Sequence, residues 1–124
     1  MDRLIQVVAK LRGPGGCPWD RKQTHRTLIK YLREETRELA AALAKADPRH
    51  MEEELGDVLL QVVLHAQLAS EAGLFDIQDV ARTLTCKLIH RHPHVFGGKK
   101  LRTAAEVVRH WEALKRRERS RRQA

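Results

Sequence analysis

Two segments within residues 28–64 share a pattern in which pairs of acidic residues interrupt apolar stripes of helical spacing. The pairs are Glu35 with Glu38 in the first segment and Glu54 with Asp57 in the second. Residues three apart lie on one face of a helix, so each pair projects from a single face. Because the same faces carry leucine and valine, they are expected to pack together. The pattern therefore predicts two packed helices with four carboxylates converging between them.

Converging carboxylates need a compensating charge. An ionised carboxylate that leaves water without a partner costs several kcal/mol or becomes protonated. Mg²⁺ prefers oxygen ligands, keeps several of its waters and often shares its site with substrate phosphates. The four acids are therefore candidate ligands of Mg²⁺, for which Mn²⁺ is the expected substitute.

A simpler interpretation is that these acids are solvated or form pairs on the helix surface. The available cations are Lys30, Arg37 and Arg49, and such exposed pairs contribute only about 0.3–0.5 kcal/mol each. Two acidic pairs that both break apolar stripes on adjacent helices favour the metal site over this alternative.

The predicted fold is all-α. Aromatic residues make up only 4% of the 124 residues, and the apolar residues are largely leucine, valine, alanine and isoleucine, a composition that favours helices packed on helices. We expect one domain over residues 1–118, an antiparallel bundle of about five helices completed by oligomerisation, and a basic, disordered tail over residues 119–124. A two-fold dimer would cover the apolar faces that a two-helix hairpin leaves open.

Capping residues predict where the two central helices begin and end. Thr24 is a suitable N-cap for a helix that extends to about residue 45. Asp47 followed by Pro48 is typical of the start of the next helix, which Gly73 is expected to end. The connection is short, so the two helices should form an antiparallel hairpin with both acidic pairs at similar height.

Shorter helices are predicted on either side of this hairpin. Residues 2–11 have amphipathic spacing, and two further helices are expected, one ended by Pro93 and one opened by Thr103 with Glu106 as a capping box. Residues 12–20 hold two prolines and three glycines and predict a loop. No Gly-Lys-Ser/Thr follows those glycines, so this is no phosphate-binding P-loop. Trp19 is expected to pin the loop to the helices or to form one wall of a ligand pocket.

Charge is unevenly distributed. Residues 1–85 carry 12 basic and 13 acidic side chains, whereas residues 86–124 carry 12 basic and three acidic ones. Such a basic block suits a phosphate-bearing substrate, a nucleic acid or only solubility. No apolar run approaches the roughly 18–20 residues of a membrane span, and no signal peptide is evident. We expect a cytoplasmic protein with no membrane partner.

Four stretches of the sequence resemble the MazG nucleoside triphosphate pyrophosphohydrolases. The first reads G-C-P-W-D-R-K-Q-T-H, the second Y-L-R-E-E-T-R-E, the third E-E-L-G-D-V-L-L-Q-V-V-L-H-A and the fourth K-L-I-H-R-H-P-H-V-F; they occupy residues 16–25, 31–38, 53–66 and 87–96. The resemblance extends over nearly the whole chain. Many MazG proteins carry two such modules in tandem, and this sequence resembles the N-terminal one.

This resemblance implies a MazG-like helix bundle in a homodimer or higher homo-oligomer. It also implies Mg²⁺-dependent cleavage of NTPs or dNTPs between the α and β phosphates, with nucleotide-pool house-cleaning as the role. The positions that match the family's metal ligands are Glu35, Glu38, Glu54 and Asp57.

Further residues match the family's substrate site. Lys87 and Arg91 match basic residues near the phosphates, and Trp111 matches a pocket-side tryptophan. Glu34 matches the motif's leading acid, and either Glu34 or Glu53 is a candidate general base.

Two alternatives remain. The first is a pyrophosphohydrolase narrowed to one nucleotide, such as a dUTP or dCTP hydrolase or the phosphoribosyl-ATP enzyme. The second is a catalytically weak regulatory or nucleic-acid-binding module that uses the basic C-terminal third. Nucleic acid is not the expected partner, because aromatic platforms are scarce and no helix-turn-helix pattern is present.

Overall fold

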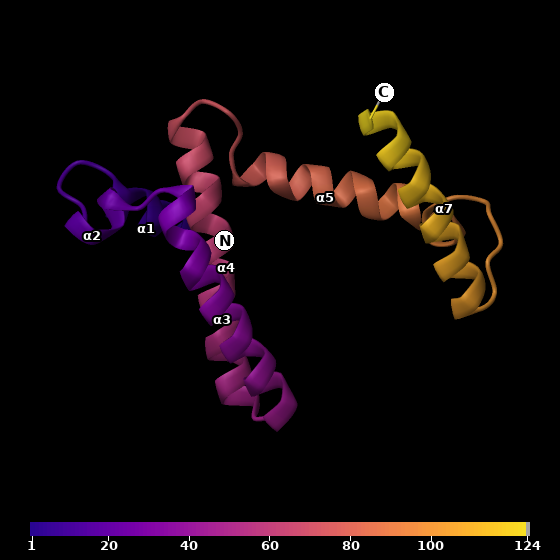
Figure 1. Ribbon diagram of the computed structural model, residues 1–124, viewed down its shortest axis with the longest axis horizontal. Coiled ribbons are helices and arrows are strands. Elements are labelled where there is room, and N and C mark those ends of the chain that lie inside the picture. Colours follow the sequence, from indigo (N-terminus) through magenta and orange to yellow (C-terminus); the bar gives the residue numbers. More distant parts are fainter. Residues whose placement is uncertain (124) are drawn as a thin grey trace. The chain divides into compact units, whose positions relative to one another are not determined.

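The computed structural model describes residues 1–123, which contain seven helices and no strand (Figure 1). This confirms the predicted all-α class. The chain divides into two compact units, Met1–Gln78 and a second that begins at Asp79. The helices are α1 (Asp2–Arg12), α2 (Pro18–Lys22), α3 (His25–Lys45), α4 (Pro48–Glu71), α5 (Ile77–Arg91), α6 (Pro93–Phe96) and α7 (Ala104–Gln123).

The first unit is built on the α3–α4 hairpin, whose two helices lie side by side (Figure 1). Thr24 caps α3 as predicted, because its hydroxyl accepts from the backbone N–H of Thr27 at 3.2 Å. Ala46 ends α3 in the left-handed region with φ 56°, and the Asp47 carboxylate accepts from the N–H of Arg49 to start α4. A two-residue connection therefore sets the register of the hairpin.

The apolar core of this unit lies toward the open end of the hairpin. Val8 of α1, Leu28 of α3, and Val63 and Leu64 of α4 are almost fully buried. Burying side chains of this size stabilises the folded state by about 1.5–3 kcal/mol each. Helix α1 thus covers the end of the hairpin that is far from its turn.

The segment predicted as a loop contains one short helix, α2 (Pro18–Lys22). Five residues are too few to show helical periodicity in the sequence. The loop before α2 turns tightly against the end of α1, where the Cys17 N–H donates to the Leu11 carbonyl at 2.8 Å. A Cβ on Gly16 would lie 2.3 Å from that same carbonyl oxygen, so only glycine fits there.

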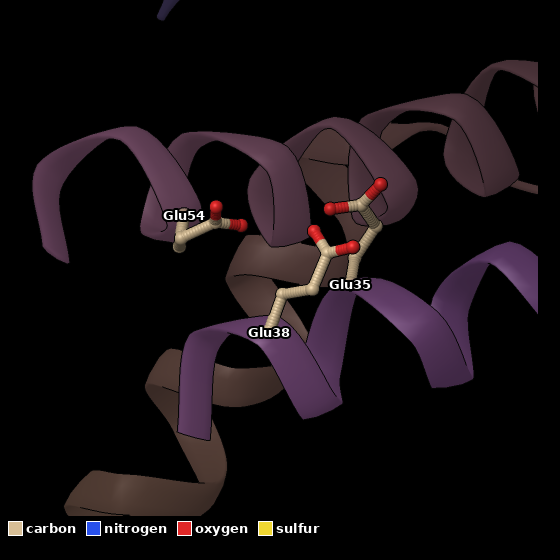
Figure 2. Close-up of side chains that lie close together, drawn as sticks. All are labelled: Glu35, Glu38 and Glu54. Carbon is tan, nitrogen blue, oxygen red and sulfur yellow. The ribbon is translucent and has the colours of Figure 1, made fainter. Parts of the chain in front are cut away.

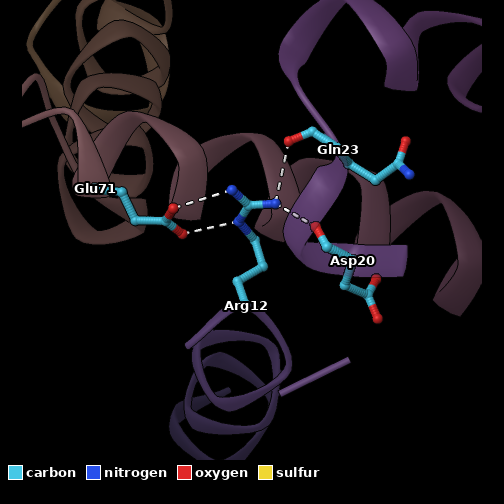
Figure 3. Close-up of polar contacts among 4 residues, drawn as sticks. All are labelled: Arg12, Asp20, Gln23 and Glu71. Carbon is cyan, nitrogen blue, oxygen red and sulfur yellow. Dashed lines mark hydrogen bonds and ion pairs between the residues drawn. The ribbon is translucent and has the colours of Figure 1, made fainter. Parts of the chain in front are cut away.

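Arg12 joins four parts of the first unit (Figure 3). Its Nε and Nη2 donate to the two carboxylate oxygens of Glu71 at 2.8 and 3.0 Å. Its Nη1 donates to the carbonyl oxygen of Gln23 at 3.2 Å and to that of Asp20. The Arg12 side chain is only 7% exposed, and these bonds lower the pKa of Glu71 below its usual range. One guanidinium therefore ties α1 and α2 to the ends of α3 and α4.

Arg12→Lys should lower the free energy of unfolding by about 1–3 kcal/mol, because an ammonium cannot reproduce the fork and leaves partly buried acceptors unmatched. Chemical denaturation followed by circular dichroism measures this change. Arg82→Lys is the matched control, because Arg82 and Asp79 form an exposed ion pair that should change by no more than about 0.5 kcal/mol. Equal losses in both variants would contradict a special role for Arg12.

In the second unit, side chains of α7 contact the C-terminal end of α5. Helix α5 ends at Arg91, two residues before Pro93, as predicted. The indole N–H of Trp111 on α7 donates to the Arg91 carbonyl at 2.8 Å. Leu114 is the only apolar side chain that is buried among the described residues of this unit. Hydrogen bonds and ion pairs therefore supply much of the contact between these two helices.

The ends of α7 differ from the sequence expectation. The Thr103 hydroxyl caps the N–H of Glu106 at 3.2 Å, but the Glu106 carboxylate accepts from the N–H of Arg102 rather than from that of Thr103. The helix continues through Gln123, over most of the segment expected to be a disordered tail. Arginine and glutamine are good helix formers and extend α7 without needing an apolar face. Ala124 lies outside the described residues, and the domain boundary at residue 118 stays a prediction.

Candidate functional site

Three of the four predicted ligands come together between α3 and α4 (Figure 2). Glu35 and Glu38 project from adjacent turns of α3 toward Glu54 of α4. One carboxylate oxygen from each lies within 4.8 Å of the other two. Glu38 lies eight residues before Ala46 and Glu54 lies seven residues after Asp47, so the two helices bring these acids to a similar height.

Two of these carboxylates are withdrawn from water. Glu54 is only 8% exposed, and Glu35 is half-buried. The Oε2 atoms of both are buried and have no hydrogen-bond partner among the described residues. Glu38 is exposed. The cluster is therefore open to solvent on one side and short of positive charge on the other.

Asp57, the fourth predicted ligand, lies one turn after Glu54 and is half-buried. It does not belong to the group of oxygens within 4.8 Å, as far as the described residues show. Its negative charge nevertheless raises the pKa of both Glu35 and Glu54. Asp57 is therefore an electrostatic neighbour of the cluster, at its edge.

Burial and like charge act together on the two withdrawn acids. Burial is the largest cause of the raised pKa of Glu35, followed by the charges of Glu38 and Asp57. Burial likewise raises the pKa of Glu54, followed by the same two charges. His50 opposes this effect, because its Nε2 lies 3.3 Å from Glu54 Oε1. A cation placed among these oxygens would relieve both causes.

The donor set fits a hard divalent cation. The clustered atoms are all carboxylate oxygens, and two of the three residues, Glu35 and Glu54, each have a buried oxygen that lacks a hydrogen-bond partner among the described residues. Mg²⁺ and Mn²⁺ prefer such ligands and retain water on an open side. Glu35, Glu38 and Glu54 would hold the ion, and the negative charge of Asp57 acts on the same carboxylates.

Three other predicted site residues belong to the first unit. Glu34 and Glu53 are exposed and each precedes a cluster residue in sequence. Trp19 is 48% exposed and contacts the ring of Tyr31 edge-on, with ring centroids 5.5 Å apart. This contact agrees with a pinning role for Trp19, and its part in a pocket stays a prediction.

The remaining predicted residues belong to the second unit. Lys87 is exposed on α5, whereas Arg91 is half-buried and forms an ion pair with Glu118 of α7. Trp111 is half-buried, with its N–H bound to the Arg91 carbonyl and its ring edge-on to His92. The structure therefore shows what holds Arg91 and Trp111 in the free protein.

Two residues near these sites were missed from sequence. His50 lies four residues before Glu54, a spacing that places both on one face of α4. Glu118 is the single acid in the basic segment 113–124, and this isolation was the only sign in the sequence that it pairs with a cation. Its partner, Arg91, lies on another helix and could not be identified from the spacing.

Comparison with known proteins identifies the family. Residues 23–96 match the family described as the MazG nucleotide pyrophosphohydrolase domain. The chain belongs to this family. The matched range contains the four predicted metal ligands as well as Lys87 and Arg91.

Relatives extend the MazG match over nearly the whole chain. It is 50% identical to the nucleoside triphosphate pyrophosphohydrolase/pyrophosphatase MazG of Thermotoga maritima, over 99% of this chain and 47% of that protein. It is 44% identical to the nucleoside triphosphate pyrophosphohydrolase of Escherichia coli strain K12, over 97% of this chain and 46% of that protein. The chain thus spans about half the length of these two curated relatives.

A solved structure agrees with the fold. The crystal structure of a mazG-related protein from Thermotoga maritima matches with a TM-score of 0.74 and 31% identity, over 94% of this chain and 99% of that one. The MazG fold therefore occurs in a chain of comparable extent.

The metal-free MazG domain should lose stability as pH rises above the ordinary glutamate value of 4.5, through the raised pKa of Glu54. The folded state holds this proton more tightly than the unfolded state, so the unfolded state binds fewer protons and the free energy of unfolding falls with pH. Glu54→Gln keeps the shape without the charge. In EDTA its melting temperature should exceed that of wild type by a margin that grows with pH.

With Mg²⁺ present, wild type should instead have a higher melting temperature than Glu54→Gln. An ion at 100 times its dissociation constant stabilises the folded wild type by about 2.7 kcal/mol, whereas Glu54→Gln should respond weakly. Glu52→Gln, an exposed site on the same helix, is the control and should behave as wild type. A pH-independent difference between wild type and Glu54→Gln, or equal Mg²⁺ responses, would contradict the buried metal site.

Proposed function

We propose that this chain is a Mg²⁺-dependent nucleoside triphosphate pyrophosphohydrolase, which cleaves NTPs or dNTPs between the α and β phosphates into a monophosphate and pyrophosphate. The observation that carries the proposal is the carboxylate cluster, in which Glu35 and Glu54 each have a buried oxygen without a hydrogen-bond partner in the described part of the chain. The names of the relatives support the same reaction. House-cleaning of the nucleotide pool is the role we propose.

The cluster residues supply the charge that such a reaction needs. Bound Mg²⁺ would neutralise phosphate charge and lower the pKa of an attacking water. Glu35, Glu38 and Glu54 would hold the ion, and the charge of Asp57 would add to theirs. Glu34 and Glu53 are exposed and each is next in sequence to a proposed ligand residue, so either is a candidate to accept the proton of the water.

The second unit supplies candidate substrate contacts. Lys87 and Arg91 lie one turn apart on α5 and present ammonium and guanidinium groups suited to phosphate. Trp111 fixes the backbone beside Arg91. In this proposal Lys87 and Arg91 bind phosphate, and Trp19 and Trp111, taken separately, are candidate contacts to the nucleotide.

A panel of NTPs and dNTPs, with and without Mg²⁺, tests the proposal when the products are resolved. Monophosphate and pyrophosphate should form only with the metal. Asp57→Ala and Glu54→Gln should lower kcat/KM by at least about 100-fold, or about 2.7 kcal/mol of transition-state stabilisation. Glu52→Gln should stay within about twofold of wild type.

Two other outcomes of the panel are informative. Diphosphate and phosphate as products would contradict cleavage between the α and β phosphates. No turnover from a folded protein that binds Mg²⁺ would favour the alternative of a regulatory or nucleic-acid-binding module. Turnover of a single nucleotide of the panel would favour the alternative of a pyrophosphohydrolase that acts on one nucleotide.

We also propose a homodimer, because the hairpin carries exposed apolar surface on α3 and on α4 in the described part of the chain. Leu55, Leu59 and Val62 form a stripe along α4 and are 37–51% exposed. Ile29 and Leu43 are exposed two heptads apart on α3. A second copy placed on this surface would complete a four-helix arrangement.

Light scattering at micromolar concentrations should give at least twice the 14.3 kDa mass of the chain. Leu59→Lys should shift the mass toward the monomer, because a charge in an apolar interface lacks a partner. Leu74→Lys is the matched control, since Leu74 is 71% exposed and lies outside both stripes. A monomeric wild type would contradict the dimer.

A further inference from the structure

Arg91 is already bound to an anion of the chain itself. Its Nη2 donates to Glu118 Oε2 at 2.6 Å, and its Nε donates to Oε1 at 3.4 Å. The two side chains are 19% and 25% exposed. A guanidinium donates two parallel hydrogen bonds to a carboxylate, and it binds a phosphate with the same bidentate geometry.

Two more cations face the same carboxylate. Lys87 lies one turn before Arg91 on α5, and Arg122 lies one turn after Glu118 on α7. The hydrogen bond from Arg91 is the largest cause of the lowered pKa of Glu118, and the charges of Lys87 and Arg122 add to it. We call Lys87, Arg91 and Arg122 the cation cluster. Three positive charges thus act on one negative charge, which leaves the cluster with a net positive charge.

The backbone around this pair is held independently of Glu118. Trp111 donates to the Arg91 carbonyl at 2.8 Å and packs its ring edge-on against His92, with ring centroids 5.1 Å apart. Leu114, one turn before Glu118, is buried. Glu118 can therefore leave Arg91 by rotating its own side chain, without parting α5 from α7.

We propose that Glu118 occupies, in the free protein, the anion position of a polyphosphate site formed by the cation cluster, and that the phosphate chain of a substrate displaces it. The inference rests on the proposed function, because it identifies how that substrate's phosphates are bound. Glu118 is a positioning residue here: it keeps the guanidinium oriented and lowers the apparent affinity for anions. A competitor that fills the site most of the time weakens binding by the fraction of empty sites.

Calorimetric titration with inorganic tripolyphosphate in EDTA tests the site without the metal centre. Glu118→Gln should bind tripolyphosphate at least about fivefold more tightly than wild type. Glu112→Gln removes the same charge from an exposed position on the same helix and should stay within about twofold. Equal gains in both variants would show a general charge effect and overturn the proposal, as would unchanged or weaker binding by Glu118→Gln.

Loss of folding is checked by the circular dichroism spectrum of each variant. If Glu118→Gln unfolds the second unit, Glu118→Asp is used, because it keeps the charge and draws the carboxylate back from Arg91 by one methylene. This variant should also bind tripolyphosphate more tightly. Weaker binding by a folded Glu118→Asp would overturn the proposal.

Turnover separates this inference from the proposed function. With a nucleoside triphosphate and Mg²⁺, Glu118→Gln should lower KM by a similar factor and leave kcat within about twofold. Tighter tripolyphosphate binding by Glu118→Gln, with no turnover in either wild type or variant, would refute the proposed pyrophosphohydrolase activity. It would still support the displacement of Glu118 by a polyphosphate. Normal turnover with unchanged KM and unchanged tripolyphosphate affinity would refute the displaced anion alone.

Discussion

The surfaces of α3 and α4 that pack together must be apolar enough to stabilise the hairpin and must also place several carboxylates close to one another. On α3 these demands alternate along one line, because Leu28, Glu35 and Ala42 follow each other at seven-residue steps. Leu28 and Ala42 are fully buried. Apolar packing on both sides of Glu35 therefore stabilises the pair of helices, and the acid is buried as a consequence of its position between them.

The height at which the acids meet depends on contacts at the two ends of the hairpin. At one end, the left-handed Ala46 and the Asp47 cap allow only a two-residue connection. At the other end, Arg12 bonds to Glu71 and to the backbone before α3, while Val8 packs beside Leu28. A slip of one turn would separate the carboxylates, so contacts remote from the cluster preserve its geometry.

Local signals in the sequence predicted the hairpin and most of the cluster, because caps, periodicity and i,i+3 spacing act over a few residues. The convergence of Glu35, Glu38 and Glu54 followed from such signals alone. The rest depended on partners distant in sequence. Arg12 lies 59 residues from Glu71, and Arg91 lies 27 residues from Glu118. Neither pair has a periodic signature, and the edge position of Asp57 depends on how closely the two helices approach.

Each unit holds a cluster of like charges that is only partly neutralised within the chain: carboxylates in the first unit and cations in the second. In the first unit, His50 stands beside Glu54 and partly offsets an excess of carboxylates. In the second, Glu118 partly offsets an excess of cations. Each internal counterion is weaker than the ligand proposed for its cluster, since one imidazole cannot match a divalent ion and one carboxylate cannot match a triphosphate. A divalent ion at the carboxylates and a phosphate chain at the cation cluster would each supply charge of the sign that the free chain lacks at that cluster.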